Sequence, residues 1–261
     1  MAIVASSYFP DTANRLYCET FEDVFTSIES GSVQYGVCAI ENSLAGSINE
    51  IYDLLLTKNV RIIGEAYLKI TMCLIELPGA TPETITRVYS HPVALAQCHD
   101  FLDSKMPLAQ RLEFHDTAGS VGLIKEKADP ANAAIAGKPA AELHKLEVIA
   151  SPIESDHGSA TRFIILGLSS AVPDDANKTS FVITTSHRPG ALYQALGVFA
   201  KRGINLTKLQ SRPLAKSTWR YMFYIDVAIG INDKRLIAAL EELDDQNCKY
   251  TVIGSYRASK K

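Results

Sequence analysis

The sequence lacks most features that mark a chain for secretion, for a membrane or for a disulfide framework. Its 261 residues include five cysteines, none in a CxxC pair, and an odd count without a secretion signal predicts reduced thiols. The first ten residues show no basic segment followed by a long apolar run. The longest apolar run, residues 163–168, is far shorter than a membrane span. We therefore expect a cytoplasmic protein without a membrane partner.

An excess of charge of one sign is also absent. The chain carries 26 Lys and Arg against 29 Asp and Glu, and no segment forms a basic stripe, so we expect no nucleic-acid partner. There is no Walker loop, no GxGxxG, no HExxH and no GxSxG, and the six histidines show no metal-ligand spacing. We expect chemistry without a cofactor and without a metal.

What is present is an alternation of strand-like and helix-like segments over the first 168 residues. Thr20 and Asp23 have the spacing of a helix N-terminus, and the apolar positions that follow recur at helical intervals. Strands are expected at 35–40, 60–63, 68–77, 87–89, 112–115, 133–136, 146–149 and 162–168. Helices are expected at 51–56, 93–102, 118–126 and from about 139. This order predicts an α/β fold.

A second domain follows a linker at residues 169–178, which are small, polar and include a proline. Strands are expected at 180–185, 204–209, 221–228 and 250–256. Pro189 suits the first turn of a helix that ends before Gly203, and Asn232 or Asp233 can cap a second helix. The order is βαββαβ, a ferredoxin-like unit. We place the domain boundary at residues 173/174.

Polar clusters occur where strands run into helices, at residues 41–43, 90–92 and 116–117. Helix N-termini with hydroxyl or amide neighbours can bind a small carboxylate, although each cluster can equally be a simple cap. A fourth cluster contains Thr161 beside Arg162, just before a strong strand. An arginine fork binds a carboxylate through two bonds, and the alternative is an exposed pair that starts a strand.

Taken together, these motifs resemble the prephenate dehydratase family. The matching segments are GVCAIENSLAGSINEIYDLL at 36–55, SHPVALAQC at 90–98, DTAGSV at 116–121, AAIAGKPAAELHKLEVIASPI at 133–153 and TRFIIL at 161–166. Residues 187–213, HRPGALYQALGVFAKRGINLTKLQSRP, resemble the ACT regulatory domain of the same enzymes. The resemblance covers nearly the whole chain in the expected order.

The resemblance implies a fold and an activity. The fold is an α/β, two-lobed periplasmic-binding-protein-like domain at 1–173, followed by an ACT domain at 174–261. Lobe 1 covers about 1–70 and 151–173, and lobe 2 covers about 71–150. The activity is that of a carbon–oxygen lyase (EC 4.2.1.51), which converts prephenate to phenylpyruvate in phenylalanine biosynthesis. Phenylalanine is the implied effector, and a homodimer or homotetramer the implied assembly.

The resemblance also implies roles for individual residues. Thr161 is the catalytic candidate, and the substrate-site candidates are Glu41, Asn42, Ser43, Ser90, Gln97, Thr117, Arg162 and Phe163. For Arg162 an ion pair that stabilises the lobe is an equal alternative, and Phe163 suits the core as well. The implied phenylalanine site comprises Pro189, Gly190, Ala191, Leu192, Asn205, Leu206, Ser211, Arg212 and Pro213.

The chain departs from the family pattern at several positions. Ser159 replaces an Asn before the TRF motif, residues 158–160 are smaller than usual, and Gln210 replaces a Glu before the SRP motif. The strand and glycine-rich turn that usually begin the first lobe are not recognisable, so we expect weak catalysis and a less stable lobe, with residues 1–7 as a possible substitute. Two alternatives stay open: arogenate dehydratase, and a catalytically weak amino-acid-sensing binding protein.

Overall fold

The computed structural model describes residues 1–10, 14–44, 46–69, 71–81, 83–155, 158, 160–168, 172–214 and 221–259, without the side chain of Ala2. Ser159 and part of the expected linker, 169–171, lie outside the described residues. The chain divides into two compact units. Unit 1 comprises residues 1–42, 46–68 and 161–261, and unit 2 comprises residues 43–45 and 69–160.

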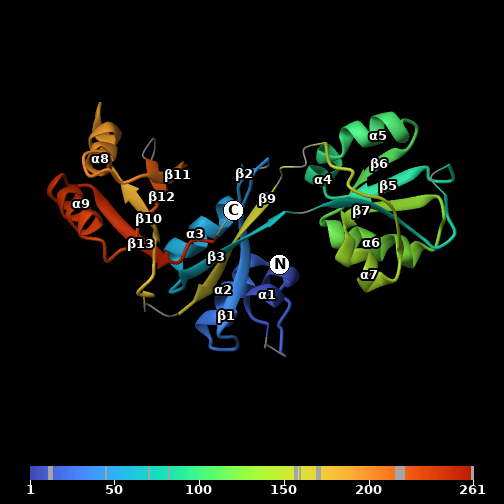
Figure 1. The fold of residues 1–261 in the computed structure, drawn as a ribbon, viewed down its shortest axis with the longest axis horizontal. Helices are drawn as coiled ribbons and strands as arrows, with labels where there is room; N and C mark the ends of the chain where they lie inside the picture. The colour runs from blue at the N-terminus through green and yellow to red at the C-terminus, as the bar shows by residue number, and fades with distance from the viewer. Residues whose placement is uncertain are drawn as a thin grey trace. The chain divides into compact units, whose positions relative to one another are not determined.

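Unit 1 is built on one sheet with the strand order β11-β12-β10-β13-β3-β9-β1-β2 (Figure 1). Its strands are β1 (Tyr35–Asn42), β2 (Gly46–Ser47), β3 (Arg61–Lys69), β9 (Ala160–Gly167), β10 (Lys178–Thr184), β11 (Leu206–Pro213), β12 (Tyr221–Val227) and β13 (Lys249–Tyr256). Its helices are α1 (Ala2–Tyr8), α2 (Phe21–Glu29), α3 (Asn49–Thr57), α8 (Ala191–Ala200) and α9 (Lys234–Asp245). The βαββαβ order from β10 to β13 confirms the predicted C-terminal domain.

The sheet of the C-terminal domain continues into the sheet of lobe 1, which the sequence did not predict. β13 pairs in parallel with β3 through Gly254 and Ile62. Only glycine fits there, because a Cβ at position 254 would clash with the backbone oxygen of Ile62 and lie 2.7 Å from its Cβ. One apolar core also includes side chains of both parts, among them Tyr52 and Leu166 of lobe 1 and Tyr224 and Ile253 of the C-terminal domain.

Local signals set the ends of several helices. The Thr20 side chain accepts a hydrogen bond from the Asp23 backbone N–H, and the Asp23 carboxylate accepts one from the Thr20 N–H, which confirms the predicted cap of α2. Helix α9 is capped by Asp233. The prediction that Pro189 lies in the first turn of a helix is wrong. Helix α8 begins at Ala191, because Gly190 takes the left-handed conformation at φ +79° just before it.

Unit 2 has its own sheet, with the order β6-β5-β7-β4-β8. The strands are β4 (Met72–Glu76), β5 (Arg87–Ser90), β6 (Gln110–Glu113), β7 (Asn132–Gly137) and β8 (Glu147–Ala150). The helices are α4 (Pro92–Gln97), α5 (His99–Lys105), α6 (Thr117–Lys127) and α7 (Lys138–His144). Its core contains Leu74, Val88, Leu102 and Ile135.

Three predicted segments differ from the structure. The expected strand 68–77 is two strands, β3 and β4, because the chain passes from unit 1 to unit 2 at residues 68/69. The expected helix 93–102 is two helices that meet at Cys98. Residues 151–160 belong to unit 2 and not to lobe 1. There the Ile153 N–H donates to the Met72 oxygen at 3.1 Å, and the Ser155 N–H to the Gln97 oxygen at 2.8 Å.

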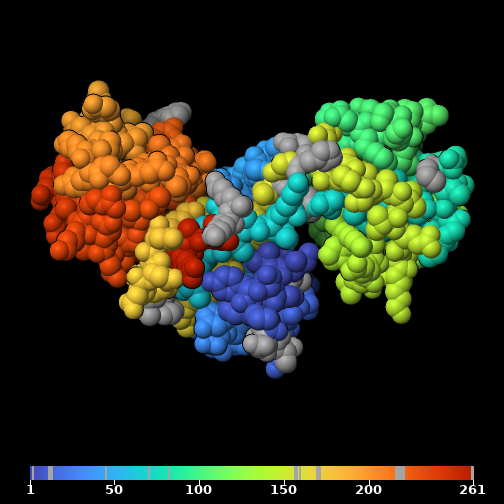
Figure 2. All heavy atoms as spheres, viewed as in Figure 1, coloured from blue at the N-terminus to red at the C-terminus, as the bar shows by residue number. Residues whose placement is uncertain are grey.

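Residues 2–8 form helix α1 and not a strand, and whether this segment fills the gap expected at the start of lobe 1 stays a prediction. Val4 packs against Phe163 and Ile165 of β9. In the space-filling view the N-terminal segment, in dark blue, forms part of the outer surface of unit 1 (Figure 2). A hollow of about 350 Å³ at Asn177 and Gly230 and a mostly apolar one of about 730 Å³ beside Phe9 and Val37 lie in unit 1. No helix among the described residues could cross a membrane.

We predict that Gly254→Ala weakens the junction of β13 with β3. The added Cβ overlaps backbone, and overpacking of this kind costs about 1–3 kcal/mol. Gly197→Ala is the matched control, since a Cβ at this helical position meets no atom within 4 Å and alanine favours a helix. Thermal unfolding should show a lower midpoint for Gly254→Ala and an equal or higher midpoint for Gly197→Ala. An unchanged midpoint for Gly254→Ala would contradict the described junction.

Candidate active site

The predicted substrate-site residues fall into two sets. Thr161, Arg162 and Phe163 on β9 and Glu41 and Asn42 on β1 belong to unit 1. Ser43, Ser90, Gln97 and Thr117 belong to unit 2. The first set is brought together because β1 and β9 are antiparallel neighbours, with Glu41 opposite Arg162 and Asn42 opposite Thr161. The pairing has a register shift between Ala39 and Glu41, an irregularity of the kind that changes the direction of the side chains at the end of a strand.

Thr161 and Asn42 form the central contact of the first set. The Asn42 side-chain amide donates to the Thr161 hydroxyl oxygen at 3.0 Å, and Thr161 is 7% exposed. Since this bond uses a lone pair of the hydroxyl, the Thr161 O–H is left as a donor with its rotation restricted. The pair can therefore offer a fixed hydrogen bond to an oxygen atom of a substrate.

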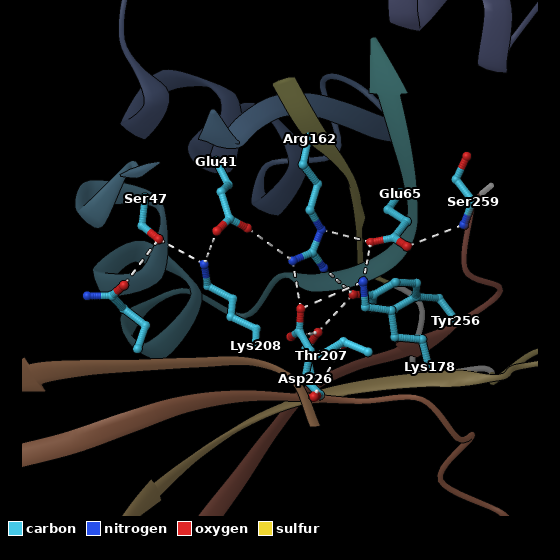
Figure 3. Close-up of polar contacts among 12 residues, drawn as sticks. Glu41, Ser47, Glu65, Arg162, Lys178, Thr207, Lys208, Asp226, Tyr256 and Ser259 are labelled. Carbon is cyan, nitrogen blue, oxygen red and sulfur yellow. Dashed lines mark hydrogen bonds and ion pairs between the residues drawn. The ribbon is translucent and has the colours of Figure 1, made fainter. Parts of the chain in front are cut away.

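Arg162 lies in a buried cluster of charges that joins lobe 1 to the C-terminal domain (Figure 3). Its Nε donates to Glu65 at 2.8 Å, its Nη1 to Asp226 at 2.6 Å and its Nη2 to the Tyr256 hydroxyl at 2.8 Å. Lys178 donates to the same Glu65 carboxylate at 2.8 Å. We call Arg162, Glu65, Asp226, Lys178 and Tyr256 the buried charge cluster.

The cluster is electrostatically balanced, with two cations and two carboxylates. Burial by itself lowers the pKa of the Arg162 guanidinium, but Tyr256, Asp226 and Glu65 together raise that pKa above its ordinary value. Burial, reinforced by Asp226, raises the pKa of the Tyr256 phenol well above its ordinary value, so the hydroxyl stays neutral. Burial and the neighbouring Arg162 lower the pKa of the Lys178 ammonium.

These contacts correct two of the expected roles. Each nitrogen of the Arg162 guanidinium donates to a partner inside the protein, and the residue is 4% exposed, which favours the ion-pair alternative over a fork for substrate. Phe163 is 3% exposed and packs with Val4 and Ile165, so it belongs to the core. Glu41 is also engaged, with one oxygen 2.8 Å from the Lys208 ammonium and the other 3.7 Å from Arg162 Nη1.

No motif in the sequence pointed to five further residues of this region: Glu65, Lys178, Lys208, Asp226 and Tyr256. The available signal was a single charged residue inside an otherwise apolar strand, as with Glu65 within IIGEAYL and Asp226 within MFYIDVA. A buried charge needs a partner, so each such residue predicts a second charge nearby. It does not reveal which distant strand supplies that charge.

The second set shows mixed roles. The Ser90 hydroxyl is fully buried and donates to the Ile135 oxygen at 2.6 Å, so it ties β5 to β7 and is not available to a substrate. Among the described residues, the buried side-chain nitrogen of Gln97 has no hydrogen-bond partner. Thr117 is the first residue of α6, whose N-cap is Asp116. The Ser43 hydroxyl accepts a hydrogen bond from the Ala160 N–H at 3.0 Å.

The capping alternative holds at two of the three strand–helix junctions. His91 accepts from the Val93 N–H at 3.2 Å, and Asp116 accepts from the Gly119 N–H at 2.6 Å. At residues 41–43 no helix begins directly, because β2 follows. No group of three or more His, Cys, Asp or Glu in the described part of the chain is arranged to hold a metal ion.

The implied phenylalanine-site residues lie in two places of the C-terminal domain. Pro189, Gly190, Ala191 and Leu192 span the start of α8. Asn205 precedes β11, which contains Leu206, Ser211, Arg212 and Pro213. Arg212 faces lobe 1, where its Nη2 lies 2.7 Å from the Asp53 carboxylate. Ser211 and Pro213 are exposed.

The structure is that of an α/β protein of two compact units, in which unit 1 includes a C-terminal βαββαβ domain. Comparison with known proteins gives the family. The prephenate dehydratase model matches residues 2–171, and the ACT domain model matches residues 179–245. The chain therefore belongs to the prephenate dehydratase family (EC 4.2.1.51) and carries an ACT regulatory domain.

Three similar proteins bear on the details. An Arabidopsis thaliana arogenate dehydratase/prephenate dehydratase 2, chloroplastic, is 38% identical over 97% of this chain and 71% of its own. A prephenate dehydratase from Arthrobacter aurescens in complex with L-Phe aligns with a TM-score of 0.86 and 33% identity, over 94% of this chain and 82% of its own. A structure titled GqqA, a novel type of quorum quenching acylases, aligns with a TM-score of 0.88 and 31% identity, over 98% and 93%.

We predict that Arg162→Gln lowers stability strongly, since it removes one of the two cations of the buried charge cluster and leaves Lys178 with two buried carboxylates. Removal of one member of a buried ion pair costs about 3–5 kcal/mol, a fall of roughly 6 °C or more in Tm for a chain of this size. Arg257→Gln is the control, because its ion pair with Asp175 is exposed and should change stability by less than about 1 kcal/mol. Equal thermal midpoints for the two variants would contradict the ion-pair role of Arg162 and favour its role in substrate binding.

Proposed function

We propose that Thr161, held by Asn42, is the group that assists departure of the ring hydroxyl of prephenate. The single observation that supports this is the 3.0 Å bond from the Asn42 amide to the Thr161 hydroxyl oxygen at the end of paired strands. In the reaction the ring carboxylate leaves as carbon dioxide, and the electron pair of the broken C–C bond moves into the ring. The C–O bond breaks, and the departing hydroxide takes a proton that comes from solvent, so that it leaves as water.

The role of Thr161 follows from its chemistry. An alcohol is a weak acid, so its contribution is a hydrogen bond that strengthens as negative charge develops on the departing oxygen. Asn42 fixes the direction of that bond before the reaction begins. Gln97 is a candidate substrate donor, since its buried amide nitrogen has no partner within the described part of the chain and would gain one from a bound carboxylate. Thr117, the first residue of α6, remains a candidate as well.

Two other activities require a direct test. Arogenate carries the same ring as prephenate with an amino group on its side chain, and the quoted motifs fit both substrates. The acylase named for the GqqA structure would require an activated nucleophile. Burial raises the pKa of Cys38 and of Cys98 to about 12 and that of Cys248 to about 11, which argues against these thiols. Parallel assays with prephenate, arogenate and an acylated amine distinguish the three.

We predict that Thr161→Ala lowers kcat for prephenate by about 10² or more, as expected for the loss of one group that assists the reaction. Thr161→Ser keeps the hydroxyl and is the matched control, with a kcat within about tenfold of the wild type. Formation of phenylpyruvate, read by its absorbance in alkali, gives the rates, and a melting curve confirms folding. A Thr161→Ala enzyme that keeps more than about a third of kcat would refute the role.

Phenylalanine is the proposed effector, and a dimer or tetramer the proposed assembly. The relative from Arthrobacter aurescens was solved with L-Phe, and this chain matches the ACT model. The Gly190 turn at the start of α8 allows a ligand to approach the backbone closely. β11 is the outermost strand of its sheet, and its exposed Leu209 offers a surface for a second copy. The five free cysteines fit a cytoplasmic location.

We expect phenylalanine to bind this chain and the chain to be at least a dimer. Titration calorimetry should show heat at millimolar or lower phenylalanine, and light scattering should give at least twice 28.5 kDa. Alanine in place of phenylalanine in the titration controls for non-specific heat. A monomer without heat from phenylalanine would overturn both statements.

A further inference from the structure

Strand β11 presents one side to lobe 1. Lys208, Gln210 and Arg212 alternate along the strand, so their side chains lie on the same face. Lys208 contacts Glu41 at 2.8 Å, Gln210 accepts a bond from Ser47 at 3.5 Å, and Arg212 contacts Asp53 at 2.7 Å. The strand that contains the SRP motif is therefore tied to lobe 1 at three successive inward positions.

Lys208 is the most constrained of these three side chains. It is 7% exposed, its ammonium donates to the Ser47 hydroxyl at 2.8 Å, and it lies 5.5 Å from the centre of the Tyr52 ring. An ammonium that is this desolvated needs its carboxylate partner. The partner is Glu41, whose side chain is 34% exposed (Figure 3).

Glu41 connects this contact to Thr161. Its second carboxylate oxygen lies 3.7 Å from Arg162, which neighbours Thr161 on β9. The next residue on β1, Asn42, bonds Thr161. Because neighbouring residues of a strand point to opposite faces, Glu41 with Arg162 fixes one face of the ladder, and Asn42 with Thr161 forms the other. Lys208 is therefore connected to Asn42 through a single intervening residue, Glu41.

We propose that Glu41 is a positioning residue, held by Lys208, that transmits the state of β11 to the Asn42–Thr161 pair. This inference rests on the proposed function, since it assigns the route by which phenylalanine bound near the SRP motif alters dehydration. Glu41 and Lys208 do not touch substrate in this account. They set the orientation of the hydroxyl that does.

The decisive variant is Lys208→Met, which keeps the length and apolar stem of the side chain and removes its charge. Lys201→Met is the matched control, because Lys201 pairs with Glu242 at 3.3 Å on the surface of the same domain. Lys208→Arg restores the charge and serves as the rescue. Glu41→Gln tests the other partner while it keeps the shape of the side chain.

The experiment uses the full chain and two readouts. The first is kcat/KM for prephenate with and without saturating phenylalanine, together with the Kd of phenylalanine. Wild type and Lys201→Met should show a phenylalanine effect of about 5–150-fold, the usual range of coupling between sites. Lys208→Met should bind phenylalanine within about threefold of the wild-type Kd, with its effect on kcat/KM reduced to less than about twofold. Lys208→Arg should regain the effect.

The second readout is the NMR signal of the Asn42 side-chain amide without any ligand, which does not depend on activity. Lys208→Met and Glu41→Gln should shift this signal, and Lys201→Met should not. Wild-type coupling in Lys208→Met, or an unmoved Asn42 signal, overturns the inference even if the enzyme is an active dehydratase. If the wild type has no dehydratase activity but Lys208→Met and Glu41→Gln still shift the Asn42 signal, the proposed function is overturned. The positioning contact is then still supported.

Discussion

The ion pair of Arg162 with Asp226 is the interaction on which the arrangement of unit 1 depends. It joins β9, which contains Thr161, to β12 of the C-terminal domain at 2.6 Å in the interior. Two cations and two carboxylates share the buried charge cluster, and its bonds from Arg162 to Asp226 and from Lys178 to Glu65 cross between the two parts. Separation of the parts would expose the apolar core they share and leave these charges to be solvated again.

Besides the Arg162–Asp226 ion pair, the C-terminal domain is joined to lobe 1 by its sheet and by side chains. Its sheet continues into lobe 1 through Gly254 and Ile62, and its strand β11 contacts the lobe through Lys208 and Arg212. A ligand that alters β11 acts on a surface already bonded to the strand that ends at Asn42. In the proposed coupling, packed strands and charged side chains connect β11 to the Asn42–Thr161 pair.

Features that neighbouring residues determine could be predicted from the sequence, whereas features that depend on contacts between distant segments could not. The capping box of Thr20 and Asp23 and the βαββαβ order were predictable, because short-range spacing determines them. The pairing of Gly254 with Ile62 joins positions far apart in the chain, and no local pattern signals it. The two readings of Arg162 differed only in burial and partners, which depend on the folded chain. The sequence could therefore nominate Thr161 and Asn42 but could not decide the role of Arg162.

Native-state hydrogen exchange tests most directly whether lobe 1 and the C-terminal domain form one cooperative body. The backbone amides of β3, β9, β10 and β13 should all exchange with the same free energy of opening. Added denaturant should lower this free energy by the same amount for all four strands. If the amides of β10 and β13 instead open at a distinctly different free energy from those of β3 and β9, the C-terminal domain folds independently and the account is contradicted.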